Sequence, residues 1–177
     1  MLASVQYYLK GELAGLQSAM LDPLEAVIQP PVLADIADHP YAYIWAGRGQ
    51  EATQTAPKVY RNVNADGSLT QGGYLKMTWQ IAVWLYALMA QDDPNIELAF
   101  PALIDMVTFQ LNTTPPTVNV TDPVTGQLSE LINIAQKVEI EYATALVTTG
   151  PAAGLVRFGC EFIVYVEEKT AWTEGLP

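Results

Sequence analysis

The stretch from Tyr74 to Met89 is the longest patterned segment of the chain. All of its odd positions are apolar: Leu75, Met77, Trp79, Ile81, Val83, Leu85, Ala87 and Met89. Its even positions are polar at first and turn aromatic at Trp84 and Tyr86. Because successive strand side chains point to opposite faces, this period of two predicts a long β-strand. We expect one face to be core throughout, and the other to be solvated at its start and covered at its end by a helix or another chain.

Two other segments have the spacing of helices. An apolar stripe predicts an N-terminal helix of about five turns, with Ser4 as the candidate N-cap. The stripe consists of Leu2, Val5, Leu9, Leu13, Leu16 and Met20. Asp22 to Glu25 resembles a helix cap and predicts a short second helical turn up to Ile28. After Asp92-Asp93-Pro94 a helical period runs to Asn112, and Pro101 either kinks this helix or begins it.

Three further strands are predicted around the long one. Residues 41–46 are aromatic and β-branched, which favours a strand. Residues 132–146 and 156–166 alternate between apolar and polar positions, and residues 148–154 join them as a hairpin loop. Cys160 lies on the apolar face of the last strand, as a small core residue. From Glu167 onward we expect a tail, in which Trp172 is either loose or docked on a partner.

Two long connections separate these elements, and connections of this length are usually functional or disordered. Residues 47–73 contain Asp66-Gly67, which closes a small hairpin with Val59 to Val63 as one arm. This segment is net positive by one in an acidic chain, so it is either a mobile loop or a basic arm that contacts acidic surface on a neighbour. Residues 113–126 are rich in turn formers and predict a second arm. The candidate interface residues are Arg48, Lys58, Tyr60, Arg61, Asp122 and Trp172.

Composition narrows the classes of function. The chain has 177 residues, which predicts a single domain over 1–177, and charged residues make up only 15% against roughly 25% in soluble domains. Low charge favours an obligate oligomer, with an apolar-rich monomer as the alternative. The net charge of -11 repels nucleic-acid phosphates. We expect no signal peptide, and the apolar run after Gln80 is about ten residues, short of the roughly 20 that span a bilayer.

No motif for catalysis or cofactor binding is present. The sequence lacks GxGxxG, P-loop and GxSxG patterns, and its single cysteine and single histidine, His39, offer no zinc site. Asp92-Asp93 and the pair Glu139 and Glu141 have the chemistry to bind a divalent cation or transfer protons. The first pair starts a helix, however, and the second follows a solvated strand face. We therefore expect no enzyme activity, no cofactor and no metal.

The order of predicted elements indicates an α+β fold, in which an antiparallel four-stranded sheet packs against two helices. In this order the sequence resembles the tail terminator proteins of long-tailed bacteriophages, also called tail-to-head joining or tail completion proteins. The resemblance lies in the Leu2 to Met20 stripe, the segment from Asp38 to Trp45 that enters a strand, the Thr78 to Leu85 strand that leads to the helix start at Asp92, and the closing strand from Phe158 to Val166.

The resemblance implies a virion protein of which six copies form a ring that caps the tail tube and joins it to the head-side connector or stopper. The ring would have an acidic lumen through which DNA slides without specific binding, consistent with a charge of -11 per copy. The resemblance implies that the partners are other copies of the chain, the tail tube protein and the head-side connector or stopper protein. It implies no contact with a membrane. Two alternatives remain: another neck or tail-tube component, and a soluble α+β dimer that binds a small apolar ligand between sheet and helices.

Overall fold

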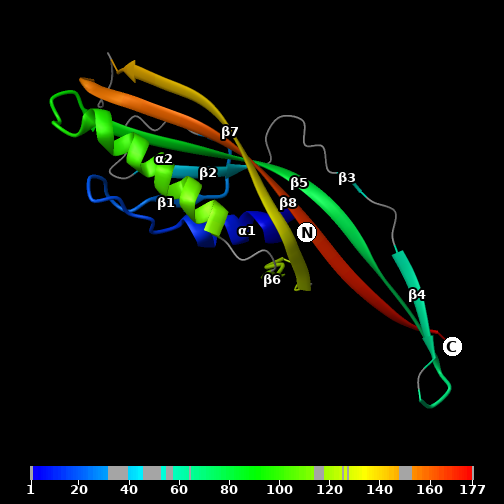
Figure 1. The fold of residues 1–177 in the computed structure, drawn as a ribbon. Helices are drawn as coiled ribbons and strands as arrows, with labels where there is room; N and C mark the ends of the chain where they lie inside the picture. Colours follow the sequence, from blue (N-terminus) through cyan, green and yellow to red (C-terminus); the bar gives the residue numbers. More distant parts are fainter. Residues whose placement is uncertain are drawn as a thin grey trace.

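The computed structural model describes residues 2–31, 40–45, 53–54, 58–63, 65–113, 118–124, 126, 128–147 and 153–176. In these residues the protein is α+β, with two helices on one side of a curled mixed sheet (Figure 1). The helices are α1 (Leu2–Leu13) and α2 (Ile96–Thr113). The strands are β1 (Glu25–Val27), β2 (Tyr41–Trp45), β3 (Thr53–Gln54), β4 (Lys58–Val63), β5 (Leu69–Ala90), β6 (Val118–Thr121), β7 (Leu128–Leu146) and β8 (Leu155–Leu176).

Strands β5 and β8 form the centre of the sheet. All 22 residues of β5 pair with β8 in one unbroken antiparallel register, from Leu69 opposite Leu176 to Ala90 opposite Leu155. A ladder of this length reaches roughly 70 Å. Around it the strands follow the order β1-β2-β5-β8-β7-β6, and β1 runs parallel to β2. Because β8 occupies one edge of β5, β2, β3 and β4 follow one another along its other edge.

The hydrophobic core lies between the two helices and one face of the sheet, and it extends over only half of the length of the sheet. Odd positions of β5 from Ile81 to Met89 are buried, as are even positions of β8 from Phe158 to Val166. The helices contribute the buried residues Val5, Leu9, Leu13, Ala99, Phe100, Leu103, Val107 and Leu111. The rings of Phe100 and Phe158 lie 5.4 Å apart between their centroids, which joins α2 to β8. The predicted apolar faces of β5 and β8 are therefore confirmed over this half of the sheet.

The opposite face of the same half is aromatic. Tyr43 and Tyr86 are only 3% and 1% exposed, and the rings of Tyr41 and Tyr43 stack with their centroids 5.7 Å apart. A Cβ atom added at Gly159 would meet Nε1 of Trp84 at 3.3 Å, so the glycine leaves room for the indole. Toward the end of β5 the even positions Ala82 and Tyr86 are buried, Trp84 and Leu88 are half-buried and Ala90 is exposed. This face is therefore only partly covered, and both described helices lie on the other face.

The N-terminal segment differs from its prediction. Helix α1 ends at Leu13 rather than near Met20, and Gly15 follows with φ of 81°, a left-handed conformation that favours glycine at a helix end. The chain then turns back, since the Gly15 N–H donates to the Leu24 C=O at 3.0 Å. The expected helical turn at 22–28 is wrong, because strand β1 forms there beside β2. Ser4 is no N-cap, since it lies inside α1 and is buried.

The four predicted strands all exist, as β2, β5, β7 and β8, and they pair antiparallel with one another. The predicted four-stranded antiparallel sheet is not matched in detail, because the sheet holds further strands and one of them, β1, pairs parallel with β2. Strand β5 begins at Leu69, and β8 continues to Leu176 through the expected tail. The predicted hairpin is confirmed: β4 and β5 flank a turn in which Gly67 has φ of 82°. The second arm holds β6, which pairs with β7. Pro101 lies inside α2 and does not begin it.

The phase of β5 gives the first testable expectation. Val83 is 0% exposed and Val59 is 53% exposed, so the same substitution meets opposite environments. Val83→Asp buries an unpaired carboxylate at a cost of several kcal/mol, a large share of the roughly 5–15 kcal/mol available. We expect it to abolish soluble, cooperatively unfolding protein, whereas Val59→Asp keeps the wild-type melting temperature within about 2 °C. Thermal unfolding of both variants checks this, and equal melting temperatures would contradict the assigned core face.

Candidate interaction surface

The long pair β5–β8 extends well beyond the part of the sheet that the helices cover (Figure 1). We define the distal ribbon as β4 with residues 69–76 of β5 and 169–176 of β8. Its two long strands reach roughly 26 Å. In this part of β5 only Gly72 and Gly73 are buried, whereas every residue from Ile81 to Val83 is buried. The apolar residues Val59 and Leu69 are 53% and 43% exposed.

The distal ribbon unites four of the six predicted interface residues. Lys58, Tyr60 and Arg61 lie in β4, which pairs with residues 69–74 of β5. Trp172 lies in β8, opposite Gly73, and is therefore part of a strand rather than a tail. Arg61 is exposed. Arg48 lies outside the described residues. Segments more than 100 positions apart in the sequence thus form one surface, which the sequence pattern did not reveal.

Asp122 lies elsewhere and is 3% exposed. Its Oδ2 atom accepts a hydrogen bond from the Ser4 hydroxyl at 3.1 Å, and its Oδ1 atom accepts one from the Val124 N–H at 2.8 Å. The carboxylate therefore ties the end of β6 to α1 inside the chain. An interface role for Asp122 does not fit this burial, because the side chain already serves a partner within its own chain.

A buried polar pair marks the root of the distal ribbon. The Trp79 Nε1–H donates a hydrogen bond to Oε2 of Glu168 at 2.6 Å, and Glu168 is 0% exposed. The two residues are diagonal neighbours across the β5–β8 ladder, since Trp79 pairs with Val166 and Met77 with Glu168. Burial of a carboxylate is costly unless donors satisfy it. The indole therefore helps to hold β5 and β8 together at the point where the core ends.

The other face of the root carries charged contacts at the surface. Lys76 Nζ lies 2.9 Å from Oε2 of Glu167, and Lys169 Nζ lies 3.3 Å from Oε2 of Glu130. Lys169 also lies over the ring of Tyr74, 4.8 Å from its centroid. The ion-paired side chains are about one-third exposed, and such pairs contribute roughly 0–1 kcal/mol each. The buried Trp79–Glu168 bond is therefore the stronger constraint on the root.

Two of the candidate catalytic groups lie in described parts of the chain and hold structural positions. Burial in the core, with a smaller contribution from the charge of Glu161, raises the pKa of the Cys160 thiol to about 11, which disfavours the reactive thiolate near neutral pH. Asp93 accepts the Asn95 N–H at 2.7 Å at the start of α2. His39 and the side chains of Glu139 and Glu141 lie outside the described part of the chain.

Neither helix of the described chain is long and apolar enough to cross a membrane. Among the described residues no three or more His, Cys, Asp or Glu side chains gather in a way that suits a metal ion.

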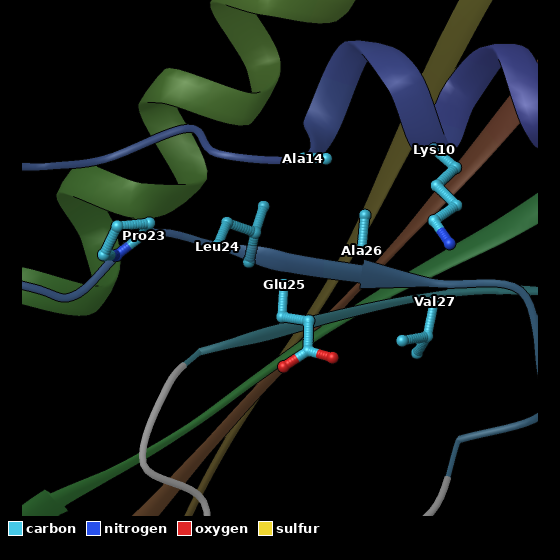
Figure 2. Close-up of a pocket in the computed structure, with 7 residues that line it drawn as sticks. All are labelled: Lys10, Ala14, Pro23, Leu24, Glu25, Ala26 and Val27. Atoms are coloured by element: carbon cyan, nitrogen blue, oxygen red, sulfur yellow. The ribbon is translucent and has the colours of Figure 1, made fainter.

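An open hollow of about 480 Å³ lies between the end of α1 and strand β1 (Figure 2). Lys10 reaches toward it from α1, while Leu24 and Ala26 point to the helix and Glu25 points to the other side of β1. The lining residues are Lys10, Ala14, Pro23, Leu24, Glu25, Ala26 and Val27. Ligand sites usually combine apolar walls with several convergent polar groups. Here the side chains of Lys10 and Glu25 do not converge on one point, so we assign no ligand to this hollow.

Comparisons with known proteins do not assign the chain to a family: no protein-family model matches it, and a search of curated proteins found no match. Function must therefore be inferred from the fold and from the distal ribbon. The ribbon is the largest departure from a compact two-layer domain, because its strands continue past the helices that complete the core (Figure 1).

The root of the distal ribbon gives the second testable expectation. Trp79→Phe keeps an aromatic ring but removes the donor to the buried Glu168, which should cost about 1–3 kcal/mol of unfolding free energy. Lys76→Met breaks the partly exposed pair with Glu167, and loss of this pair should cost under about 1 kcal/mol. Urea unfolding of both variants measures the difference. Equal losses would show that the buried bond is no stronger than the surface pair.

Proposed function

We propose that this chain is a structural protein of a tailed bacteriophage virion, in which copies of it form a ring at the head end of the tail. In this proposal six copies cap the finished tail tube and join it to the head-side connector or stopper protein. The protein is made in the host cytoplasm and resides in the virion. The distal ribbon is the observation that carries the proposal, because neither described helix covers it.

Two physical features of the ribbon support an assembly role. Small sheets need a hydrophobic face against a core, or a packed helix, for independent stability. The distal ribbon leaves Val59 and Leu69 about half exposed and lies beyond both helices (Figure 1). A neighbouring copy would cover this surface. The low content of charged residues, 15%, points in the same direction, because an oligomer exposes less surface per residue than a monomer.

The remaining features are compatible with a channel for DNA. Each copy carries a net charge of -11, so a ring of copies concentrates negative charge around its opening. Such a field repels DNA phosphates and lets the duplex pass without specific binding. The α+β fold, with one helix before the first strands and one directly after β5, has the element order on which the resemblance rests.

The ligand-binding alternative is less favoured. An apolar ligand between sheet and helices would occupy space that buried side chains fill, among them Phe100, Leu103 and Phe158. Protein cores are packed nearly as densely as organic crystals. The described interior therefore supports a structural role over a binding cavity.

The proposal predicts rings that depend on the ribbon's charge. Negative-stain images of concentrated protein, alone or with tail tubes, should show rings that sit on tube ends. Arg61→Glu, on the exposed edge of β4, should reduce assembly at least tenfold at low salt, because it places like charges together at the contact. Lys10→Glu changes the net charge equally but lies on α1, and it should assemble as wild type does. A wild-type protein that stays monomeric with tubes present would overturn the proposal.

A further inference from the structure

The hydrogen bonds of β1 reveal which strand residues face which neighbour. In the parallel pair β1–β2, the Glu25 N–H donates to the Pro40 C=O at 2.9 Å. Backbone groups of alternate residues point to opposite edges of a strand. The backbone N–H and C=O groups of the even-numbered residues of β2 therefore point to β1, and those of Tyr41, Tyr43 and Trp45 point to β5.

The same alternation extends across the centre of the sheet. The partners of those three residues are even-numbered in β5. The backbone N–H and C=O groups of even-numbered β5 residues therefore point to β2 and β4, and those of odd-numbered β5 residues point to β8. Because the β5–β8 register is unbroken, the backbone groups of even-numbered β8 residues point to β5 along the whole strand. The backbone groups of odd-numbered β8 residues point away from β5. The bond from the Val147 N–H to the Leu155 C=O, 2.9 Å, agrees, since an odd residue of β8 there faces the β7 side.

On this basis the distal ribbon has two open edges. Strand β7 pairs with β8 only as far as Lys169, so the N–H and C=O groups of Thr173 and Gly175 face outward with no described strand beside them. In β4, Lys58, Tyr60 and Asn62 pair with even residues of β5. The backbone groups of Val59, Arg61 and Val63 therefore face outward on the other edge, again with no described strand beside them.

These edges are longer than the outermost strands of the sheet. The outer strands β1 and β6 have only three and four residues, and very short edge strands are a common protection against unwanted pairing. Strand β7 also runs beyond its pairing with β6, over residues 132–146, with no described strand on that side. Strand β4 has six residues, and β8 continues unpaired by β7 from Thr170 to Leu176. Long open edges are templates for the addition of another strand.

We propose that the two open edges of the distal ribbon pair with each other between copies, so that β8 of one copy adds to β4 of the next. This inference rests on the proposed ring. Both β4 and β8 run antiparallel to β5 and therefore share one direction. Rotation between neighbouring copies of a six-membered ring turns a strand by much less than a reversal, so the new pair is parallel rather than antiparallel. The contact joins two different surfaces, which generates a closed ring or a filament rather than an isolated dimer.

Charge favours this pairing over the pairing of like edges. By sequence, β4 contributes the basic residues Lys58 and Arg61, and the end of β8 contributes the acidic residue Glu174. Two β4 edges side by side would bring like charges together, which destabilises cross-strand pairs, whereas β4 beside β8 combines opposite charges. The occupant of each edge is therefore a second copy of this chain.

The test removes one outward N–H from each edge. Val59→Pro and Thr173→Pro each delete a backbone donor that faces outward, so the ladders of β4 and β8 with β5 keep their hydrogen bonds. Val59→Ala and Thr173→Ala are matched controls, because they shorten the same side chains and keep the N–H groups. Sedimentation velocity and native mass spectrometry measure assembly, and thermal unfolding verifies the fold.

Each proline variant should be monomeric under conditions in which wild type and both alanine variants form rings. A mixture of the two proline variants should form a one-to-one heterodimer and nothing larger. The β8 edge of the Val59→Pro variant and the β4 edge of the Thr173→Pro variant can still pair. The mixture can therefore form only the contact between these two edges. Rings of either proline variant, or a mixture that stays monomeric, would overturn the edge pairing and leave the proposed ring function standing. A wild-type protein that forms no ring with tubes would overturn the ring function itself.

A cysteine pair decides the question if a proline variant is less stable than its alanine control. In one copy, positions 61 and 173 lie on opposite sides of β5, about 10 Å apart, beyond the roughly 7 Å that a disulfide spans. The double variant Arg61→Cys with Thr173→Cys should therefore form disulfides only between copies. Oxidation should yield a ladder of linked copies on denaturing gels, whereas each single variant should stop at dimers. A double variant that also stops at dimers would contradict the pairing of β4 with β8.

Discussion

The unbroken ladder between β5 and β8 is the constraint on which the rest of the structure depends. Its 22 residue pairs contain no register shift, so the alternation of faces and edges set at one end holds to the other. Residues 81–89 of β5 supply one wall of the core against α1 and α2, and residues 69–76 continue as part of the distal ribbon (Figure 1). By contrast, β7 shifts register against β8 twice, and it pairs with less of the strand.

The change from core to ribbon occurs at a few residues. Trp79 packs against the core cluster and donates to Glu168, which is wholly buried although it carries a carboxylate. Beyond this point the side chains of β5 are only partly covered, and the contacts are surface ion pairs. The energy that holds the ribbon together thus comes from backbone pairing and from the root rather than from a core of its own. A segment of this kind is suited to pairing with another copy, because it has area to cover and unpaired backbone groups.

The central pattern could be predicted from the sequence, because it depends on local periodicity. Val83 and Phe162 lie in runs with a period of two, and the structure buries both. The ends of these runs could not be predicted in the same way. Glu168 occupies the apolar face of β8, so the apolar alternation stops there although the strand continues to Leu176. Strand β1 has three residues, too few for any periodicity, and forms because β2 offers an edge.

Long-range pairing explains the other differences. The contact between Ser4 and Asp122 joins residues 118 positions apart, and no local signal reveals it. The same holds for Trp172, which becomes part of the candidate surface only because β5 pairs with β4 on one side and β8 on the other. Gly15 lies within the predicted apolar stripe, and it ends α1 because the chain returns there to Leu24, 9 positions further on.

Residue-resolved amide hydrogen exchange tests the central claim most directly, because the claim concerns individual N–H groups. In dilute, monomeric protein, the outward N–H groups of Thr173, Gly175 and Arg61 should exchange much faster than those of Trp172, Glu174 and Tyr60, which face β5. On assembly the outward set should become as slow as the inward set. Outward groups that are equally protected in the monomer, or that stay fast in the assembled ring, would contradict the account.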